Sequence, residues 1–230
     1  MVELIPKLKK ITPIWWEFQW DEKPSEKLLN TLLALNEWLW DQYGNNLKEA
    51  RQGYQCLSLI WKKPPSIDIE LSFPSIDLNS KKEKATWKIP VCYGGKFGKD
   101  LERLCKEKKL TEKEFIELHS KTSYRLDFYG FLPGFMYLSG LDESLSFPRK
   151  QFPERVVKAG SVGIGGNQTG IYPIDSPGGW QLIGKTPISV FSPFENPPVK
   201  PKVGDQIVFV PITEDEFEQL KNNPFSLQKV

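Results

Sequence analysis

The sequence predicts an α+β protein in which a mixed α/β region is followed by a β-rich barrel or sandwich. Residues 1–129 contain 7 prolines and 5 glycines, whereas the shorter segment 130–211 contains 11 prolines and 12 glycines. The short apolar runs between these turn residues are typical of strands rather than helices. The polar, lysine-rich segment 79–84 predicts a linker. We therefore expect two domains, over residues 1–87 and 88–230.

The first domain is predicted to combine strands with helices. The aromatic run 11–20 is strand-like, and Ser25 is placed to cap a helix that continues to about residue 42. Leucines recur along this segment at helical spacing, at positions Leu28, Leu32, Leu35 and Leu39. Residues 54–61 alternate as a strand, and a second, looser helical stretch is expected after Pro65. Seven of the eight tryptophans precede residue 90, where they serve either a core or a partner-binding face.

The remainder of the chain is predicted to be rich in strands. A strand is expected at 86–93, followed by helices over 98–109 and 111–121, the second opened by a capping box of Thr111 and Glu114. Short strands then alternate with tight turns, which favours a barrel or a sandwich. Another capping box, Thr213 with Glu216, predicts a short C-terminal helix.

Composition argues against several classes of protein. The 31 Lys+Arg and 29 Asp+Glu leave a formal charge of +2, without the basic excess of a nucleic-acid-binding protein. No run of 18 apolar residues indicates a membrane span, and the N-terminal residues lack the apolar core of a signal peptide, so a cytoplasmic protein is expected. One histidine and three widely spaced cysteines exclude a two-histidine metal site in this chain and a disulfide framework, and we expect no metal.

Residues 179–186 match the phosphate-loop expression G-x-x-x-x-G-K-[ST] letter for letter. A true phosphate loop wraps the anion with its backbone amides, and its Lys-Thr pair opens a helix. Here Pro187 follows Thr186 at once, and the next residues alternate like a strand. We therefore interpret the match as fortuitous.

The glycine-rich segment 163–170 lacks the spacing of a dinucleotide fingerprint, and Pro173 stops any helix after it. It is either a turn at which a ligand approaches the backbone or a purely structural turn. Gln168, Thr169 and Tyr172 supply neutral donors and acceptors on or beside it.

Two further features have both a structural and a functional interpretation. His119 is either a residue near the end of its helix, favourable there when charged, or part of a site. Arg149, Arg155 and Lys158 form either a solvated basic face or a clamp for a carboxylate or another anion.

Six segments, in this order, resemble the family of the 5-oxoprolinase B subunit, also known as the KipI-type kinase inhibitor or allophanate hydrolase subunit 1. They are IPVCYGGKFGKDLERL, ELHS, YGFLPGFMYLSGLD, FPRK, AGSVGIGGNQTGIYPIDSPGGWQLIGKTP and VGDQIVFVPI. The resemblance covers roughly residues 88–220, and the first 85 or so are matched only by length and by the order of strands and helices. Lys185 stands where the family usually has an arginine, which creates the phosphate-loop match.

The resemblance implies a ferredoxin-like α/β domain over 1–87 and a cyclophilin-like β-barrel over 88–230. It also implies the site residues. The catalytic set is Gln168, Thr169, Tyr172 and His119, and the residues that face substrate or a partner are Gly134, Phe135, Ser176, Gly178, Gly179 and Trp180. We expect residues 130–138 and 163–180 to line one concave face of the barrel, because glycines permit close approach and the aromatic residues wall off water.

The same resemblance implies one subunit of an ATP-dependent 5-oxoprolinase that acts with subunits A and C to open 5-oxoproline to glutamate. The chain offers hydrogen-bond donors but no evident nucleophile–base pair, so it is expected to contribute to a composite site, with ATP used by the complex. Relatives also inhibit a histidine kinase or form part of the carboxyltransferase region of urea carboxylase, and both remain alternatives. The Met-Lys-Met segment of a biotin carrier is absent, so biotin would have to come from a partner.

Overall fold

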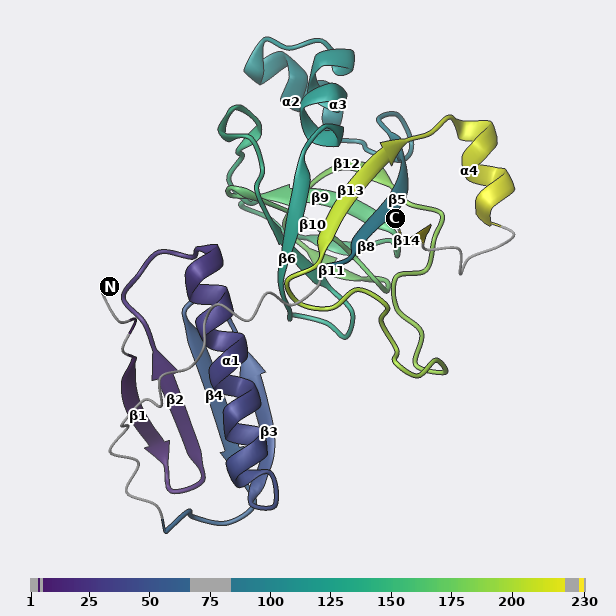
Figure 1. The fold of residues 1–230 in the computed structure, drawn as a ribbon. Coiled ribbons are helices and arrows are strands. Elements are labelled where there is room, and N and C mark those ends of the chain that lie inside the picture. Colours follow the sequence, from purple (N-terminus) through teal and green to yellow (C-terminus); the bar gives the residue numbers. More distant parts are fainter. Residues whose placement is uncertain (1–3, 5, 67–83, 222–227, 230) are drawn as a thin grey trace. The chain divides into compact units, whose positions relative to one another are not determined.

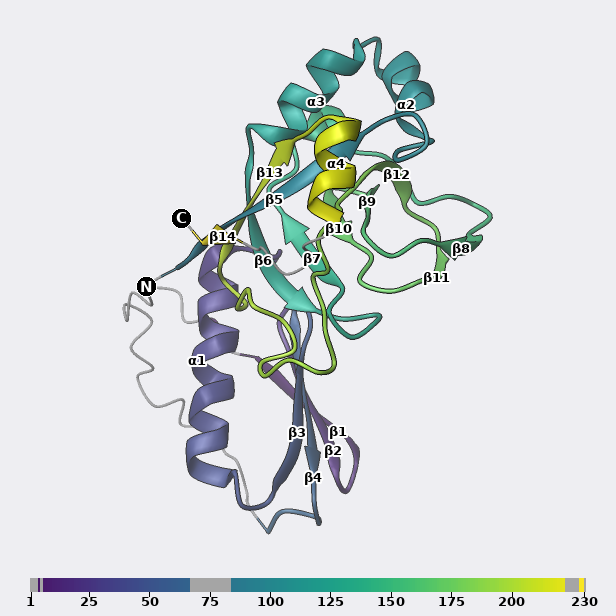
Figure 2. The same ribbon diagram turned by 90° about the vertical axis from the view of Figure 1, so that its right-hand side faces the viewer.

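A computed structural model describes residues 4, 6–66, 84–221 and 228–229 of the 230-residue chain. The chain divides into two compact units, Met1–Glu83 and Lys84–Val230, which are drawn in Figures 1 and 2 and are described separately. The second helical stretch expected after Pro65 and most of the predicted linker 79–84 lie outside the described residues. In the described part of the chain, no helix is long and apolar enough to cross a membrane.

Within its described residues, the first unit is a four-stranded antiparallel sheet with a helix on one face (Figure 2). The strands are β1 (Lys7–Thr12), β2 (Trp15–Gln19), β3 (Leu47–Gln52) and β4 (Cys56–Trp61), in the spatial order β1-β2-β4-β3. The helix is α1 (Glu26–Tyr43), and the Ser25 Oγ caps it as predicted by accepting a hydrogen bond from the Leu28 N–H at 3.1 Å. The four predicted leucines are buried against the sheet.

The aromatic run 11–20 differs from its prediction as one strand. The chain turns at residues 13–14, so the run contributes the end of β1 and all of β2. Trp16, Trp20 and Trp61 are buried in the core of this unit, whereas Trp15 is exposed. The ferredoxin-like arrangement is not confirmed, because that fold follows the order βαββαβ and the elements described here follow ββαββ.

The second unit is a closed barrel of seven strands within its described residues. These are β5 (Thr86–Tyr93), β6 (Ser123–Tyr129), β7 (Met136–Ser139), β9 (Ser161–Gly165), β10 (Gln168–Ile171), β12 (Gln181–Lys185) and β13 (Gln206–Pro211). Neighbours follow the order β12-β9-β10-β7-β6-β13-β5, and β12 pairs with β5 to close the barrel. β5 and β13 are parallel, and the other neighbours are antiparallel. The predicted barrel or sandwich is therefore a barrel, and its cyclophilin-like class stays a prediction.

Helices and a short ribbon surround the barrel. α2 (Leu101–Lys108) and α3 (Glu112–Ser120) lie over one end of it (Figure 1), and α4 (Glu214–Lys221) packs against β5. β8 (Glu154–Val157) pairs with β11 (Ser176–Gly178), β14 (Gln228–Lys229) pairs with β5, and η1 (Glu143–Leu145) is a single 3-10 turn.

Both predicted capping boxes are confirmed. The Glu114 N–H donates to the Thr111 Oγ1 at 3.2 Å, and the Glu216 N–H donates to the Thr213 Oγ1 at 3.3 Å. The helix predicted from residue 98 begins at Leu101, because the Asp100 carboxylate instead accepts a hydrogen bond from the Leu182 N–H at 2.7 Å.

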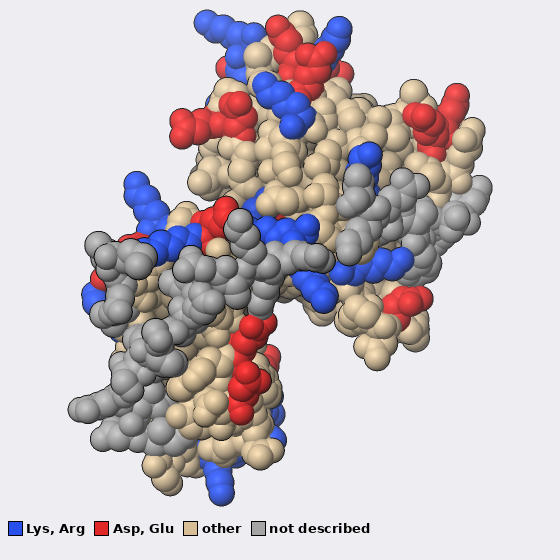
Figure 3. Space-filling model, viewed as in Figure 1, with Lys and Arg blue, Asp and Glu red and all other residues tan. Residues whose placement is uncertain are grey.

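The phosphate-loop match is a strand in the structure. Gln181–Lys185 is β12, and no helix begins between residues 186 and 212. Charged side chains of both signs are interspersed on the face of the molecule shown in Figure 3. That mixture agrees with the near-equal totals of basic and acidic residues.

Candidate functional site

The strands β9 and β10 form a wall with two different faces. Every residue of both strands is buried. Because side chains alternate along a strand, Thr169 and Ile171 point into the barrel beside Ile164, and we call this the inner face. Gln168 and Gly170 lie on the opposite side, which an aromatic cluster covers and which we call the outer face. The predicted site residues are divided between these two faces.

The inner face holds a chain of hydrogen bonds centred on His119, which α3 places in the barrel interior. The His119 Nδ1 lies 2.8 Å from the Tyr93 hydroxyl, and its Nε2 lies 3.0 Å from the Thr169 Oγ1. The Thr169 hydroxyl donates to the Gly163 carbonyl at 3.1 Å. A hydroxyl has only one proton to give, so Thr169 accepts from Nε2–H and Tyr93 donates to Nδ1. His119 is therefore a neutral Nε2–H tautomer with both nitrogens satisfied.

Burial keeps this network neutral. The imidazole stacks on the Phe209 ring at a centroid distance of 4.8 Å, and burial lowers the pKa of His119 from 6.5 to about 3. Burial also raises the pKa of Tyr93 well above its ordinary value. His119 and Thr169 are both 0% exposed. The structure thus brings these two predicted catalytic residues together beneath the wall, where they can position β10.

On the outer face, the Trp180 side chain packs on a stripe of three glycines. A Cβ atom built on Gly165 would lie 2.6 Å from the indole ring, and one on Gly170 would lie 3.0 Å from it. A Cβ atom on Gly163 would lie 3.1 Å from the Trp180 Cβ. These distances are at or below the limit of ordinary contact. The glycines at these three positions therefore serve the packing of Trp180.

Aromatic contacts join the two segments that were expected to share a face. The Phe135 ring lies 5.1 Å from the Tyr172 ring and 5.4 Å from the Trp180 ring, in both cases edge to face. The Tyr137 ring lies 5.8 Å from that of Trp180. Edge-to-face pairs of this kind add stability beyond the area they bury. The aromatic side chains of residues 130–138 and 172–180 therefore form one packed cluster over β9 and β10.

Tyr172 is part of this packing. Its side chain is 1% exposed, and a Cβ atom on Gly178 would lie only 2.4 Å from its hydroxyl oxygen. Burial raises the pKa of Tyr172 to about 12, although a backbone hydrogen bond from Trp180 opposes the rise. Tyr172 is therefore a neutral phenol that holds the 178–180 turn against the barrel.

Three other predicted residues have local roles in turns. Gly134 has a φ of +82°, and a Cβ atom there would lie 2.5 Å from the Phe191 Cβ. The Ser176 hydroxyl donates to the Pro177 carbonyl at 3.1 Å. The Gly179 carbonyl accepts a hydrogen bond from the Lys150 N–H at 2.6 Å. These positions shape the loops around the cluster.

Gln168 has a different environment. Its side chain is 9% exposed, and within the described residues its amide makes no hydrogen bond. A mostly buried amide with unused donors and acceptors costs stability unless something pairs with it. Gln168 is therefore the predicted residue best placed to bind a polar group from outside the chain.

Arg149 also lies on the outer face. The sequence left open whether its basic run is a solvated face or an anion clamp. Its guanidinium lies 5.7 Å from the centre of the Trp180 ring, its side chain is exposed, and it has no ion pair among the described residues. By contrast, Lys158 is paired with Asp175 at 2.7 Å. Arg149 is the member of the basic run that lies beside an aromatic ring, a proximity that the sequence does not reveal, and its role as a clamp stays a prediction.

Phe131 borders the same cluster and was not predicted as a site residue. It is 60% exposed, its φ of +62° lies in the left-handed region, and its ring lies 6.5 Å from that of Tyr172. An exposed aromatic residue in a strained backbone conformation is typical of functional surfaces.

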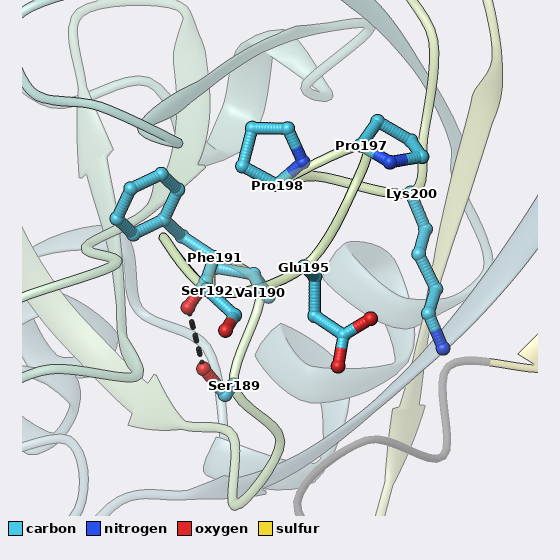
Figure 4. Close-up of a pocket in the computed structure, with 8 residues that line it drawn as sticks. All are labelled: Ser189, Val190, Phe191, Ser192, Glu195, Pro197, Pro198 and Lys200. Atoms are coloured by element: carbon cyan, nitrogen blue, oxygen red, sulfur yellow. Dashed lines mark hydrogen bonds between the residues drawn. The ribbon is translucent and has the colours of Figure 1, made fainter.

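The described residues include no group of three His, Cys, Asp or Glu side chains that could hold a metal ion. Figure 4 shows a small pocket formed by residues 189–200, in which the Ser189 hydroxyl donates to the Phe191 carbonyl at 2.8 Å. Its volume is about 20 Å³, room for about one water molecule. This pocket is too small for an organic substrate.

Comparison with known proteins places these features in a family. The chain matches the family described as carboxyltransferase domain, subdomain C and D, over residues 7–200. It is 45% identical over 154 residues to the B subunit of 5-oxoprolinase from Bacillus subtilis, an alignment that covers 67% of this chain and 64% of the relative. The chain thus spans less than two thirds of that relative's length.

A second relative is matched more fully. The chain is 41% identical over 174 residues to the B subunit of 5-oxoprolinase from Escherichia coli O157:H7, covering 74% of this chain and 80% of the relative. Among solved structures, the urea amidolyase of Kluyveromyces lactis superposes on 100% of this chain and 16% of its own, with a TM-score of 0.75 and 17% identity. That last likeness concerns the fold alone. The family match begins at residue 7, so it includes the tryptophan-rich first unit.

Proposed function

Because the chain belongs to the carboxyltransferase C and D domain family, together with the B subunit of 5-oxoprolinase, we propose that it is one subunit of an ATP-dependent 5-oxoprolinase. It contributes the outer face of its barrel to a composite site that opens 5-oxoproline to glutamate. The observation that carries the proposal is the pair of polar side chains, the Gln168 amide and the Arg149 guanidinium, that have no hydrogen bond or ion pair among the described residues on the face covered by Trp180.

The chemistry of the substrate fits these two groups. 5-Oxoproline is a lactam that bears a carboxylate, and water attack on its amide carbon places negative charge on the lactam oxygen. The Gln168 amide donates a hydrogen bond to that oxygen, where a fixed donor has its largest effect on rate. Arg149 pairs with the carboxylate, for which its planar fork of donors is suited. The Trp180 ring, over which Arg149 lies, limits the access of water.

The inner face supports this site without touching substrate. Thr169 follows Gln168 along β10, and its hydrogen bonds to His119 and Gly163 hold the strand in register. We assign His119 and Thr169 as positioning residues. Tyr172 holds the turn that carries Trp180, and we assign it the same kind of role.

The rest of the catalytic machinery belongs to partner subunits. The described residues form no phosphate-binding loop and the chain's one histidine is buried, so they fit neither ATP nor a nucleophile–base pair. We assign both to subunits of the A and C types. Exposed apolar side chains on the segments bordering the outer face, at Phe131, Phe152, Val156 and Ile174, offer the contact surface.

Reconstitution tests this function. The chain is combined with the A-type and C-type subunits from the same organism, and ATP-dependent release of glutamate from 5-oxoproline is measured. We expect activity only in the complete mixture. Activity at the same rate without this chain contradicts the proposal.

A carboxyltransferase is a second candidate, which the family match over residues 7–200 favours. Such a subunit would transfer a carboxyl group to or from biotin on a partner carrier. Incubating the complex with a carboxylated biotin carrier and following loss of the carboxyl group separates the two activities. Inhibition of histidine kinase autophosphorylation, assayed with the chain alone, tests the remaining alternative.

A further inference from the structure

A second cavity lies on another part of the barrel from the aromatic cluster. It has a volume of about 530 Å³, the size of a small-molecule site. It lies where α4 faces the end of β12 and the loop after it. The residues that line it include Lys96, Phe97, Lys185, Thr186, Phe217 and Glu218. None of these residues belongs to the outer face.

Lys185 is the cation of this cavity that has no ion pair. Lys96 is paired with Glu214, and Lys221 lies 3.5 Å from Glu218. No such partner of Lys185 occurs in the described part of the chain. Burial lowers the pKa of Lys185 from its ordinary value, which means that burial destabilises the charged ammonium. A bound anion would offset that destabilisation.

The stem of the Lys185 side chain packs against the backbone at Gly160. Gly160 has a φ of +82°, and a Cβ atom built on it would lie 3.5 Å from both Cγ and Cε of Lys185. The lysine stem therefore runs along the surface of Gly160. A residue with such a constrained stem loses less side-chain entropy when it binds a ligand than a free surface lysine does.

Besides the acid Glu218, the walls include apolar side chains and a hydrogen-bond donor. The Phe97 and Phe217 rings pack against each other at a centroid distance of 4.5 Å. The buried Thr186 Oγ1 accepts a hydrogen bond from the Ile188 N–H at 3.2 Å, which leaves its own proton available to an acceptor. Aromatic surface, one unpaired ammonium and a hydroxyl donor are together suited to a small organic acid.

We propose that this cavity binds a small carboxylate with an apolar body, its carboxylate paired with Lys185 and its carbon skeleton against Phe97 and Phe217. A single negative charge matches the single unpaired cation. A phosphate dianion would exceed it and would face Glu218, which also lines the cavity. The proposal is independent of the activity assigned to the outer face.

Titration calorimetry on the full chain tests this site with three probes: benzoate, the neutral analogue benzamide, and inorganic phosphate. We expect benzoate to bind saturably with a Kd of about 1 mM or tighter. Benzamide and phosphate should bind at least about tenfold more weakly. Absence of saturable benzoate binding at about 10 mM overturns the proposal, and phosphate binding as tight as that of benzoate overturns the carboxylate assignment.

Two variants should move the affinity in opposite directions. Lys185→Met keeps the length of the stem and removes the charge, so benzoate affinity should fall about tenfold or more. Glu218→Gln removes the lining acid and frees Lys221, so affinity should rise. Lys106→Met, at an exposed lysine of α2 paired with Glu102 and outside the cavity, is the matched control and should change nothing. Circular dichroism checks that each variant is folded, and benzoate binding that Lys185→Met leaves unchanged contradicts the site.

Discussion

The two faces of the wall formed by β9 and β10 differ in whether their polar side chains have hydrogen-bond partners. On the inner face, the His119, Tyr93 and Thr169 polar atoms are all paired, and the imidazole is fully buried. On the outer face, the Gln168 amide and the Arg149 guanidinium lack such partners within the described residues. A satisfied buried network stabilises one conformation, whereas unused donors can bind a substrate. The contrast supports our proposal that the inner face stabilises the barrel and the outer face contributes to the composite site.

The largest effect should come from removing the centre of the inner network. His119→Ala leaves a cavity and deprives the Tyr93 and Thr169 hydroxyls of their partner, so we expect unfolding to become easier by about 3 to 5 kcal/mol. Urea denaturation of the whole chain measures this. A loss below about 1 kcal/mol would show that the network does not stabilise the barrel.

The same histidine should make stability depend on pH. Its pKa is about 3 in the folded protein and 6.5 as an ordinary value, so the unfolded chain binds the proton more readily between these limits. The contribution of His119 to the free energy of unfolding is therefore fully present above pH 6.5. It is lost as pH falls, by about 2 to 3 kcal/mol down to pH 4.5. Tyr93 and Tyr124, which face the ring, stay neutral in this window because burial raises their pKa values.

Other groups also titrate in that range, so a matched variant is needed to isolate the histidine. His119→Gln retains a polar side chain without a titrating ring. The difference in unfolding free energy between wild type and His119→Gln should shrink as pH falls from 6.5 to 4.5. A difference that stays constant with pH would contradict a neutral, buried His119.

Tyr172→Phe tests whether the Tyr172 hydroxyl contributes only to packing or also to the reaction. The hydroxyl is buried against Gly178 and is held by the Trp180 backbone. Its removal should lower stability by about 1 to 2 kcal/mol. The specific activity of the reconstituted complex should fall only as far as the fraction of folded protein falls. A tenfold loss of rate in fully folded protein would instead give Tyr172 a direct role.

Gln168→Ala should lower the rate of the complex and should have the smallest effect on stability, the reverse of what we expect for Tyr172→Phe. Because its amide makes no hydrogen bond within the described residues, the melting temperature should change little or rise slightly. The rate of the complex should fall about tenfold or more, equivalent to about 1.4 kcal/mol. Asn167→Ala, at the exposed neighbouring position, is a control that should leave the rate unchanged. Full activity of folded Gln168→Ala removes this residue from the site.

Local sequence signals predicted the elements that depend on nearby residues. The Ser25 cap, the leucines of α1 and the two capping boxes are formed as expected, because helix caps and helical periodicity are decided within a few residues. The rejection of the phosphate loop at Lys185 succeeded for the same reason, since Pro187 prevents a helix there. The turn at residues 13–14 was missed because the run 11–20 holds only the last two residues of β1, too few to be recognised as a separate strand.

The family, the β-rich second unit and the residues of its glycine-rich and aromatic segments could all be predicted from the amino-acid sequence. Which face of β10 each of these residues occupies depends on the tertiary structure. Gln168 and Thr169 are adjacent in the chain, yet one points outward with its amide unused and the other is bonded to His119 inside the barrel. A strand alternates its side chains between two faces, and only barrel closure through β12 and β5 makes one of those faces the interior.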